Sequence, residues 1–177
     1  MKIPVDLLLA REAVMINGIY PLIREAGGAR FEIDTDTARL DLAAIHRFLA
    51  ASHWAKGIPL PLLERAIRHS LVFGLYRDGR QVGFARVVTD HATFAYLADV
   101  FVLNEERAQG LGRWLVETIL ADPRLQGMRR WLLGTRDAQG LYERCGFSPP
   151  PPPFAFMERL DADVYAEAPS PRRRRSV

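Results

Sequence analysis

The sequence predicts an α/β (α+β) protein with a mixed, mostly antiparallel sheet of about six to seven strands flanked by about four helices. Short apolar runs separated by turn signals fill the middle of the chain, as in an antiparallel meander. After residue 103, strand-like and helix-like segments alternate, which is typical of a partly parallel sheet covered by helices. The chain has 177 residues, 49% hydrophobic and 25% charged, so we expect one domain with a buried core.

The first half of the chain is expected to form one strand and two short helices. A Gly-Gly pair closes a weakly amphipathic leader over residues 1–29, which we expect to lie at the periphery. Residues 30–36 then have the composition of a strand. Apolar residues three and four positions apart predict helices over 40–52 and 60–70, and prolines before the second mark its start.

The second half supplies the rest of the sheet. A run of prolines at 149–153 can form neither helix nor ladder, so it is expected to be an extended connector before the last strand. We therefore expect the domain over 30–162 and a flexible, arginine-rich tail over 163–177. The expected strands are 71–78, 81–90, 94–103, 129–135 and 154–160, and the expected helices are 110–121 and 137–146.

The charge distribution argues against a nucleic-acid surface on the folded part. The net charge is +3, but Arg172–Arg175 contribute four positive charges, which leaves 20 basic against 21 acidic residues elsewhere. Phosphate backbones need a clustered basic face, so we do not expect nucleic acid as a partner of the domain. The tail is read as a solvated end, with weak contact to nucleic acid or anionic lipid left open.

The N-terminus and the cysteine content predict a cytoplasmic protein. Asp6, Arg11 and Glu12 interrupt the apolar leader before a signal peptide or a spanning helix could form, so we expect no membrane partner. The single cysteine, Cys145, excludes an internal disulfide and fits a reducing compartment. The four histidines show no metal-ligand spacing, and no metal is expected. Whether the chain forms a homodimer is left open.

The segment ERAQGLGRWL, residues 106–115, is the candidate ligand loop. A helix that begins at Gly110 or Leu111 presents unpaired N–H groups that favour a phosphate. Glycine at 110 and 112 removes the β-carbons that would keep a diphosphate from the backbone, and Arg107 and Arg113 can add charge at the rim. The alternative is a loop that merely lets a strand turn tightly into a helix.

Two common phosphate loops do not fit this segment. A mononucleotide P-loop needs lysine followed by serine or threonine after its second glycine, whereas Arg113 and Trp114 follow Gly112. A dinucleotide fingerprint needs a third glycine, where this chain has Leu115.

The motif Arg107-x-x-Gly110-x-Gly112 resembles the signature of the GNAT superfamily, the acyl-CoA-dependent N-acyltransferases. The order of strands and helices over 31–160 also resembles the GNAT fold. A second signature, alanine, tyrosine and Gly-Phe at set spacing, is matched by Ala138, Tyr142, Gly146 and Phe147.

The resemblance implies an N-acetyltransferase that moves the acetyl group of acetyl-CoA to a primary amine of a small molecule, by direct attack in a ternary complex. A backbone N–H near Phe101 or Val102 would bind the oxyanion. Thr135 stands where the family often has asparagine, so one hydrogen bond to the pantetheine arm is replaced or lost. The cofactor-binding residues implied are Phe101, Val102, Arg107, Ala108, Gln109, Gly110, Leu111, Gly112, Arg113, Thr135 and Ala138.

Two residues are predicted to be catalytic. Tyr142 is expected to protonate the leaving thiolate, although its spacing also suits a core position. The strand before the glycine loop lacks the glutamate that many members use as base and has Asp99 instead. A water relay competes with Asp99, and Tyr96 and His91 are weaker relay candidates. Cys145 is read as packing rather than as a nucleophile.

The acceptor site is expected between the first two helices and at the meander turn. Ser52, Trp54 and Tyr96 are the predicted substrate-binding residues. The face of Trp54 could hold an ammonium by cation–π attraction, or the ring could simply pack between the helices. Two other functions compete with the enzyme: an acyl-CoA-binding regulator without turnover, and an adaptor that uses its arginine tail.

Overall fold

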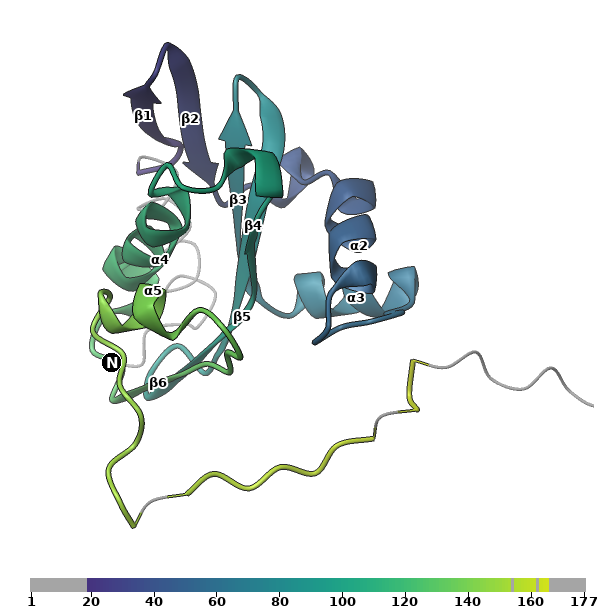
Figure 1. The fold of residues 1–177 in the computed structure, drawn as a ribbon, viewed down its shortest axis with the longest axis vertical. Helices are drawn as coiled ribbons and strands as arrows, with labels where there is room; N and C mark the ends of the chain where they lie inside the picture. The colour runs from purple at the N-terminus through teal and green to yellow at the C-terminus, as the bar shows by residue number, and fades with distance from the viewer. Residues whose placement is uncertain (1–18, 154, 162, 166–177) are drawn as a thin grey trace, which may run out of the picture.

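The protein is built on a six-stranded sheet with the strands in the order β1-β2-β3-β4-β5-β6 (Figure 1). The computed structural model describes residues 19–153, 155–161 and 163–165. Neighbouring strands are antiparallel except β5 and β6, which are parallel, so the predicted mixed, mostly antiparallel sheet is confirmed. The strands are β1 Leu22–Ala26, β2 Ala29–Asp34, β3 Leu71–Arg77, β4 Arg80–Thr89, β5 Phe94–Val102 and β6 Arg130–Leu132.

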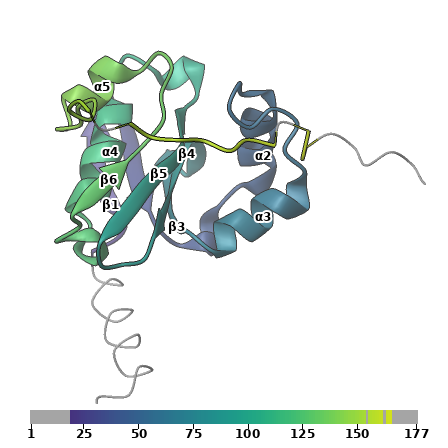
Figure 2. The ribbon, with the colours of Figure 1, turned by 90° about the horizontal axis from the view of Figure 1, so that it is seen from below.

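Four helices among the described residues cover the two faces of the sheet. α2 and α3 lie on one face, and α4 and α5 lie on the other (Figure 2). The Asp41 carboxylate starts α2 by accepting the N–H of Ala44 at 2.9 Å, a cap that the sequence analysis did not identify. Pro59 precedes α3, as predicted. The helices are α2 Leu42–Ala51, α3 Leu60–Arg68, α4 Leu111–Ala121 and α5 Gln139–Glu143, with short 3-10 turns at Thr37–Arg39, Asn104–Glu106 and Pro123–Leu125.

Each face of the sheet has its own apolar core. On the α4 side, Phe73 and Leu115 are fully buried, and on the α2 side Leu49 and Phe84 are fully buried. Strand alternation sends successive side chains to opposite faces, which is why one strand can serve both cores. β5 does this near its end, where Phe101 joins the α2 side.

The start of the described chain belongs to the sheet. Residues 22–26, placed by the sequence analysis in the leader, form β1, and Gly27 and Gly28 form the turn into β2 with φ of +60° and +78°. The hydroxyl of Tyr20 donates to the Asp122 carboxylate at 2.9 Å. The Gly-Gly pair is therefore a hairpin turn. The remainder of the expected leader, residues 1–18, lies outside the described residues.

The expected last strand over 154–160 is wrong for the residues that the structure describes there. Residues 155–160 pair with no strand and cross below the domain from the α5 side toward the α2 side (Figures 1 and 2). The prolines at 149–153 donate no ladder hydrogen bonds, and β6 itself is only three residues long. Most of the arginine-rich tail, including Arg172–Arg175, lies outside the described residues. In the part described, no helix is long and apolar enough to cross a membrane.

Two buried tyrosines, Tyr76 and Tyr142, and the partly buried Tyr20 predict a loss of stability at alkaline pH. Burial raises the pKa of Tyr76 and Tyr142 to about 12 and raises that of Tyr20 above its ordinary value. A phenol that keeps its proton only in the folded state contributes stability below its unfolded pKa of about 10, and this contribution is lost as the pH rises through the folded value. We therefore expect the free energy of unfolding to fall between about pH 10 and pH 12.

Chemical denaturation at stepped pH, together with the absorbance of tyrosinate, measures this effect. The chain has five tyrosines, and we expect three of them to titrate late. Titration of all the tyrosines together near pH 10 would contradict the assignment of buried phenols.

Candidate functional site

The site is built around an open edge of β5. The strands β5 and β6 pair only from Phe94–Arg130 to Tyr96–Leu132, whereas β5 continues to Val102. Residues 97–102 therefore have β4 on one side and no β6 on the other. Since N–H and C=O groups alternate in direction along a strand, part of this backbone is open to hydrogen bonding by an extended ligand.

The glycine loop follows directly from this strand. Ala108 and Gly110 have positive φ, +64° and +75°, and α4 then begins at Leu111. No described side chain caps this helix, and Trp114 is the first residue whose N–H bonds within it, to the carbonyl of Gly110. Among the residues that the structure describes, the amides of Leu111, Gly112 and Arg113 thus have no hydrogen-bond partner at the positive end of this 11-residue helix.

The structure explains the two glycines of the motif differently. Gly110 needs its left-handed φ of +75° for the turn into α4. Gly112 has no such conformation, and a β-carbon there would meet only Leu141 Cδ2 at 3.7 Å and Val102 Cγ2 at 3.9 Å, which are ordinary contacts. Neither the backbone nor the packing of the protein demands glycine at 112. A ligand that approaches these amides would account for the glycine.

The loop is anchored by residues that the sequence analysis missed. Glu106 is only 3% exposed, and its carboxylate accepts hydrogen bonds from Arg77 Nη1 at 2.9 Å and from Gln109 Nε2 at 3.2 Å. The predicted Arg107 donates from Nε to the carbonyl of Val102 at 3.1 Å. These bonds fix the loop against β3 and the end of β5, so that it is in place before any ligand binds.

The charge at the start of α4 differs from the expectation. Arg113, expected at the rim, pairs with Glu117 at 2.7 Å, which partly neutralises it. Arg24 from β1 reaches the same place: its Nη1 lies 4.0 Å from where a β-carbon of Gly110 would be, and its guanidinium lies 5.9 Å from the centre of the Trp114 ring. The sequence analysis did not identify Arg24, since residue 24 lies in the expected leader.

Tyr142 combines a buried ring with an unbonded hydroxyl. The residue is 9% exposed, and its ring packs edge-to-face on Phe147 with centroids 6.0 Å apart. Among the described residues its hydroxyl makes no hydrogen bond. The Tyr76 hydroxyl is also unbonded there but is fully buried, whereas the Tyr142 hydroxyl is not. Burial, with smaller effects of Cys145 and Tyr96, raises the pKa of Tyr142 to about 12. At neutral pH this phenol is therefore protonated, and its hydroxyl can donate a hydrogen bond.

The beginning of α5 is held by Thr135. Its Oγ1 accepts the N–H of Ala138 at 3.0 Å, so the oxygen is used within the protein while the hydroxyl proton stays available. Cys145 lies in the turn after α5, where its N–H donates to the carbonyl of Tyr142 at 2.9 Å, and burial raises the pKa of its thiol. A thiol with a raised pKa is a poor nucleophile, which agrees with the packing role.

Asp99 lies at an irregular position of β5. Its φ is +53°, and the pairing register with β4 shifts between Phe84 and Arg86. One carboxylate oxygen accepts from Arg86 Nε and the other from Trp54 Nε1 at 3.1 Å, and the side chain is 8% exposed. Both oxygens are thus engaged, one of them by a cation, and the role of Asp99 as base stays a prediction.

The remaining predicted residues differ in how close they lie to the open edge of β5. Tyr96, 39% exposed, lies at the last pairing of β5 with β6, where the open edge begins. The buried Ser52 hydroxyl donates to Leu49 O at 2.7 Å and accepts from Ala55 N at 3.2 Å, so it finishes α2 and has no free group for a substrate. His91 lies in the turn before β5, roughly 20 Å along the strand from Phe101 at about 3.3 Å per residue, too far for a proton relay.

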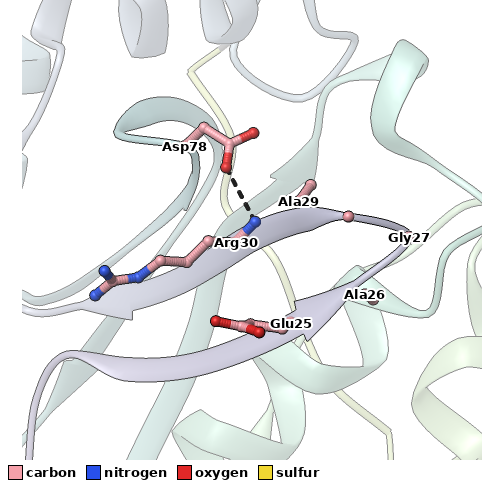
Figure 3. Close-up of a pocket in the computed structure, with 7 residues that line it drawn as sticks. Glu25, Ala26, Gly27, Ala29, Arg30 and Asp78 are labelled. Carbon is pink, nitrogen blue, oxygen red and sulfur yellow. Dashed lines mark hydrogen bonds between the residues drawn. The ribbon is translucent and has the colours of Figure 1, made fainter.

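A surface hollow elsewhere contains none of the predicted residues. It lies beside the β1–β2 turn, where the backbone N–H of Arg30 donates to Asp78 at 3.0 Å (Figure 3). Two hairpin turns form its walls, so the packing of the hairpins is enough to account for the hollow. Among the described residues no group of three or more metal-ligating side chains occurs.

Comparison with known proteins points to one family. Residues 68–149 match the family model described as the acetyltransferase (GNAT) domain. A crystal structure of a provisionally named GNAT-family acetyltransferase from Xanthomonas campestris pv. campestris is 52% identical, covers 77% of this chain and 96% of its own, and has a TM-score of 0.73.

Two further relatives extend the comparison. A provisionally named acetyltransferase of Gibberella zeae is 35% identical in an alignment of 107 residues. The match covers 49% of this chain and 60% of the length of that relative. A structure of AAC(6')-Iy in complex with the bisubstrate analogue CoA-S-monomethyl-acetylneamine is 19% identical, covers 73% of this chain and 99% of its own, and has a TM-score of 0.56. At this identity the last likeness concerns the fold alone.

Proposed function

Since the chain belongs to the GNAT acetyltransferase family, we propose that it transfers the acetyl group of acetyl-CoA to a primary amine of a small molecule, by direct attack in a ternary complex. The family uses acyl-CoA as the acyl donor, and the thioester supplies the activated acyl group. The acetyl group and the small amine are the parts of the proposal that go beyond the family.

The uncapped start of α4 beside the open edge of β5 carries this proposal. The amides of Leu111, Gly112 and Arg113 would hold a diphosphate, with Arg107 and Arg24 as nearby cations. The backbone of residues 97–102 would bind the extended arm that follows. The loop residues Ala108 and Gln109, with Thr135 and Ala138 at the start of α5, would border the bound arm.

The chain's own residues have distinct proposed roles in the reaction. A backbone N–H at Phe101 or Val102 would stabilise the oxyanion. The Tyr142 hydroxyl would donate its proton to the leaving thiolate. The amine, with a free pKa of about 10, must first lose a proton. Because Arg86 and Trp54 engage Asp99, we favour water as the first acceptor of that proton, with Asp99 holding the surrounding groups in place.

A second candidate is a non-catalytic acyl-CoA-binding regulator with the same fold. The observation that favours it is the state of Asp99: β5 has no glutamate, and its one acid is ion-paired. Such a protein would bind the cofactor at α4 without releasing thiol. The two candidates differ only in turnover.

Thermal unfolding with and without acetyl-CoA tests the cofactor site. At about a hundred times its dissociation constant, the ligand should add roughly 2.7 kcal/mol of stability. No shift would overturn both candidates. Release of free thiol across a panel of primary amines then decides between them, because only the enzyme produces it, and a shift without thiol release would favour the regulator.

A further inference from the structure

An aromatic wall leads from the end of β5 to the surface on the α2 side. The Phe101 ring stacks on that of Phe48, with centroids 3.9 Å apart and planes at 12°. Phe48 in turn contacts Trp54, with centroids 6.3 Å apart. Exposure increases along this path, because Phe101 is 6% exposed and Trp54 is 46% exposed. One end of the wall thus lies at the proposed oxyanion position and the other lies in solvent.

Trp54 is exposed but held in a fixed orientation. Its indole N–H donates to Asp99 at 3.1 Å, and Asp99 is itself ion-paired with Arg86. His53 packs edge-on against the indole with centroids 5.0 Å apart. A large aromatic ring that stays exposed while its polar edge is bonded offers a preorganised surface for a flat apolar group.

The surrounding charge argues against an acceptor with several positive charges. Residues 41–70, which include α2 and α3, carry four basic side chains, Arg47, Lys56, Arg65 and Arg68, against two acidic ones, Asp41 and Glu64. The acid that contacts Trp54 already has a cationic partner. A polyamine would therefore meet like charge here and find no free carboxylate on the wall.

We infer that the aromatic wall of Phe101, Phe48 and Trp54 binds the acceptor, and that the acceptor is a monoamine carried on a flat apolar or aromatic body. This inference rests on the proposed acyl transfer, because the wall leads to the position proposed for the thioester. Asp99 and Arg86 act in it as positioning residues that orient Trp54.

Calorimetric binding of phenethylamine and spermidine, each with and without CoA, tests the inference. Phenethylamine should bind at least about tenfold more tightly than spermidine, a difference of about 1.4 kcal/mol. Trp54→Ala and Trp54→Leu should each weaken phenethylamine binding about tenfold, while Trp54→Phe, which keeps an aromatic face, should lose much less. The leucine variant fills similar space, so it serves if the alanine variant does not fold.

A matched control is Ile23→Ala on β1, since Ile23 is 53% exposed and lies at the opposite edge of the sheet. It should leave both affinities unchanged. Tighter binding of spermidine, or unchanged phenethylamine binding in both Trp54 variants, would overturn the inference. The binding assay does not depend on turnover, so the two proposals can fail separately. Phenethylamine binding that depends on Trp54, without thiol release, would support the acceptor site and contradict the proposed enzyme. Thiol release with spermidine in preference to phenethylamine would support the enzyme and contradict the acceptor site.

Discussion

Replacing Tyr142 with phenylalanine is expected to lower turnover about a hundredfold or more while acetyl-CoA affinity is unchanged. The substitution removes only the hydroxyl, which has no hydrogen-bond partner among the described residues. The ring, which packs on Phe147 with centroids 6.0 Å apart, stays in place. The free energy of unfolding should therefore hardly change. A loss confined to turnover is the effect expected of a proton donor to the thiolate.

Steady-state thiol release measures the turnover number, and calorimetry measures acetyl-CoA binding. Cys145→Ala, in the turn directly after α5, is the matched control, because its thiol has a raised pKa and no proposed role. Tyr96→Phe tests the neighbouring phenol as an alternative donor. Turnover at the wild-type level in Tyr142→Phe would remove this residue from the mechanism, and an equal loss in Cys145→Ala would indicate damage to the helix instead.

The loop and its helix could be predicted from the sequence because their physics is local. Glycine at 110, the apolar spacing of residues 111–121 and the strand before them are all encoded within about twenty residues. The same holds for the turn between the expected strands 71–78 and 81–90 and for the prolines that precede α3. These elements were confirmed close to their predicted bounds.

The contacts that finish the site could not be predicted, since they join distant parts of the chain. Arg77 meets Glu106 from 29 residues away, and Trp54 meets Asp99 from 45 residues away. Arg24 was hidden because a short strand with four exposed residues has no alternating apolar pattern to reveal it. Asp99 could be identified as an unusual acid on β5, but its ion pair with Arg86 depends on the register of two strands.

The C-terminal segment shows that a local sequence pattern can also predict an element that does not form. The apolar composition of residues 154–160 is that of a strand, but a strand forms only where a partner ladder is available. In the described part, β6 pairs on one side with β5, and residues 155–160 do not reach its other edge. Composition therefore predicted a tendency that the fold does not use.

Replacing Gly112 with alanine is expected to change stability and binding in opposite directions. Gly112 is helical, and its β-carbon would make only ordinary contacts with Leu141 and Val102, so alanine should raise the free energy of unfolding by roughly 0.5 kcal/mol through its better helix propensity. The same methyl group would lie between the end of β5 and α5, where the ligand is proposed to pass. We expect acetyl-CoA affinity to fall about tenfold, or about 1.4 kcal/mol.

Gly140→Ala provides the matched control, because Gly140 is also helical and its β-carbon would meet only Arg144 Nη1 at 3.7 Å. Both variants should gain a similar stability in chemical denaturation, and only Gly112→Ala should lose affinity in calorimetry. Gly110→Ala would not serve, since its φ of +75° strains any other residue. If Gly112→Ala were stabilised and bound acetyl-CoA like the wild type, the glycine would have no ligand to accommodate. The diphosphate would then have to be bound somewhere other than the start of α4.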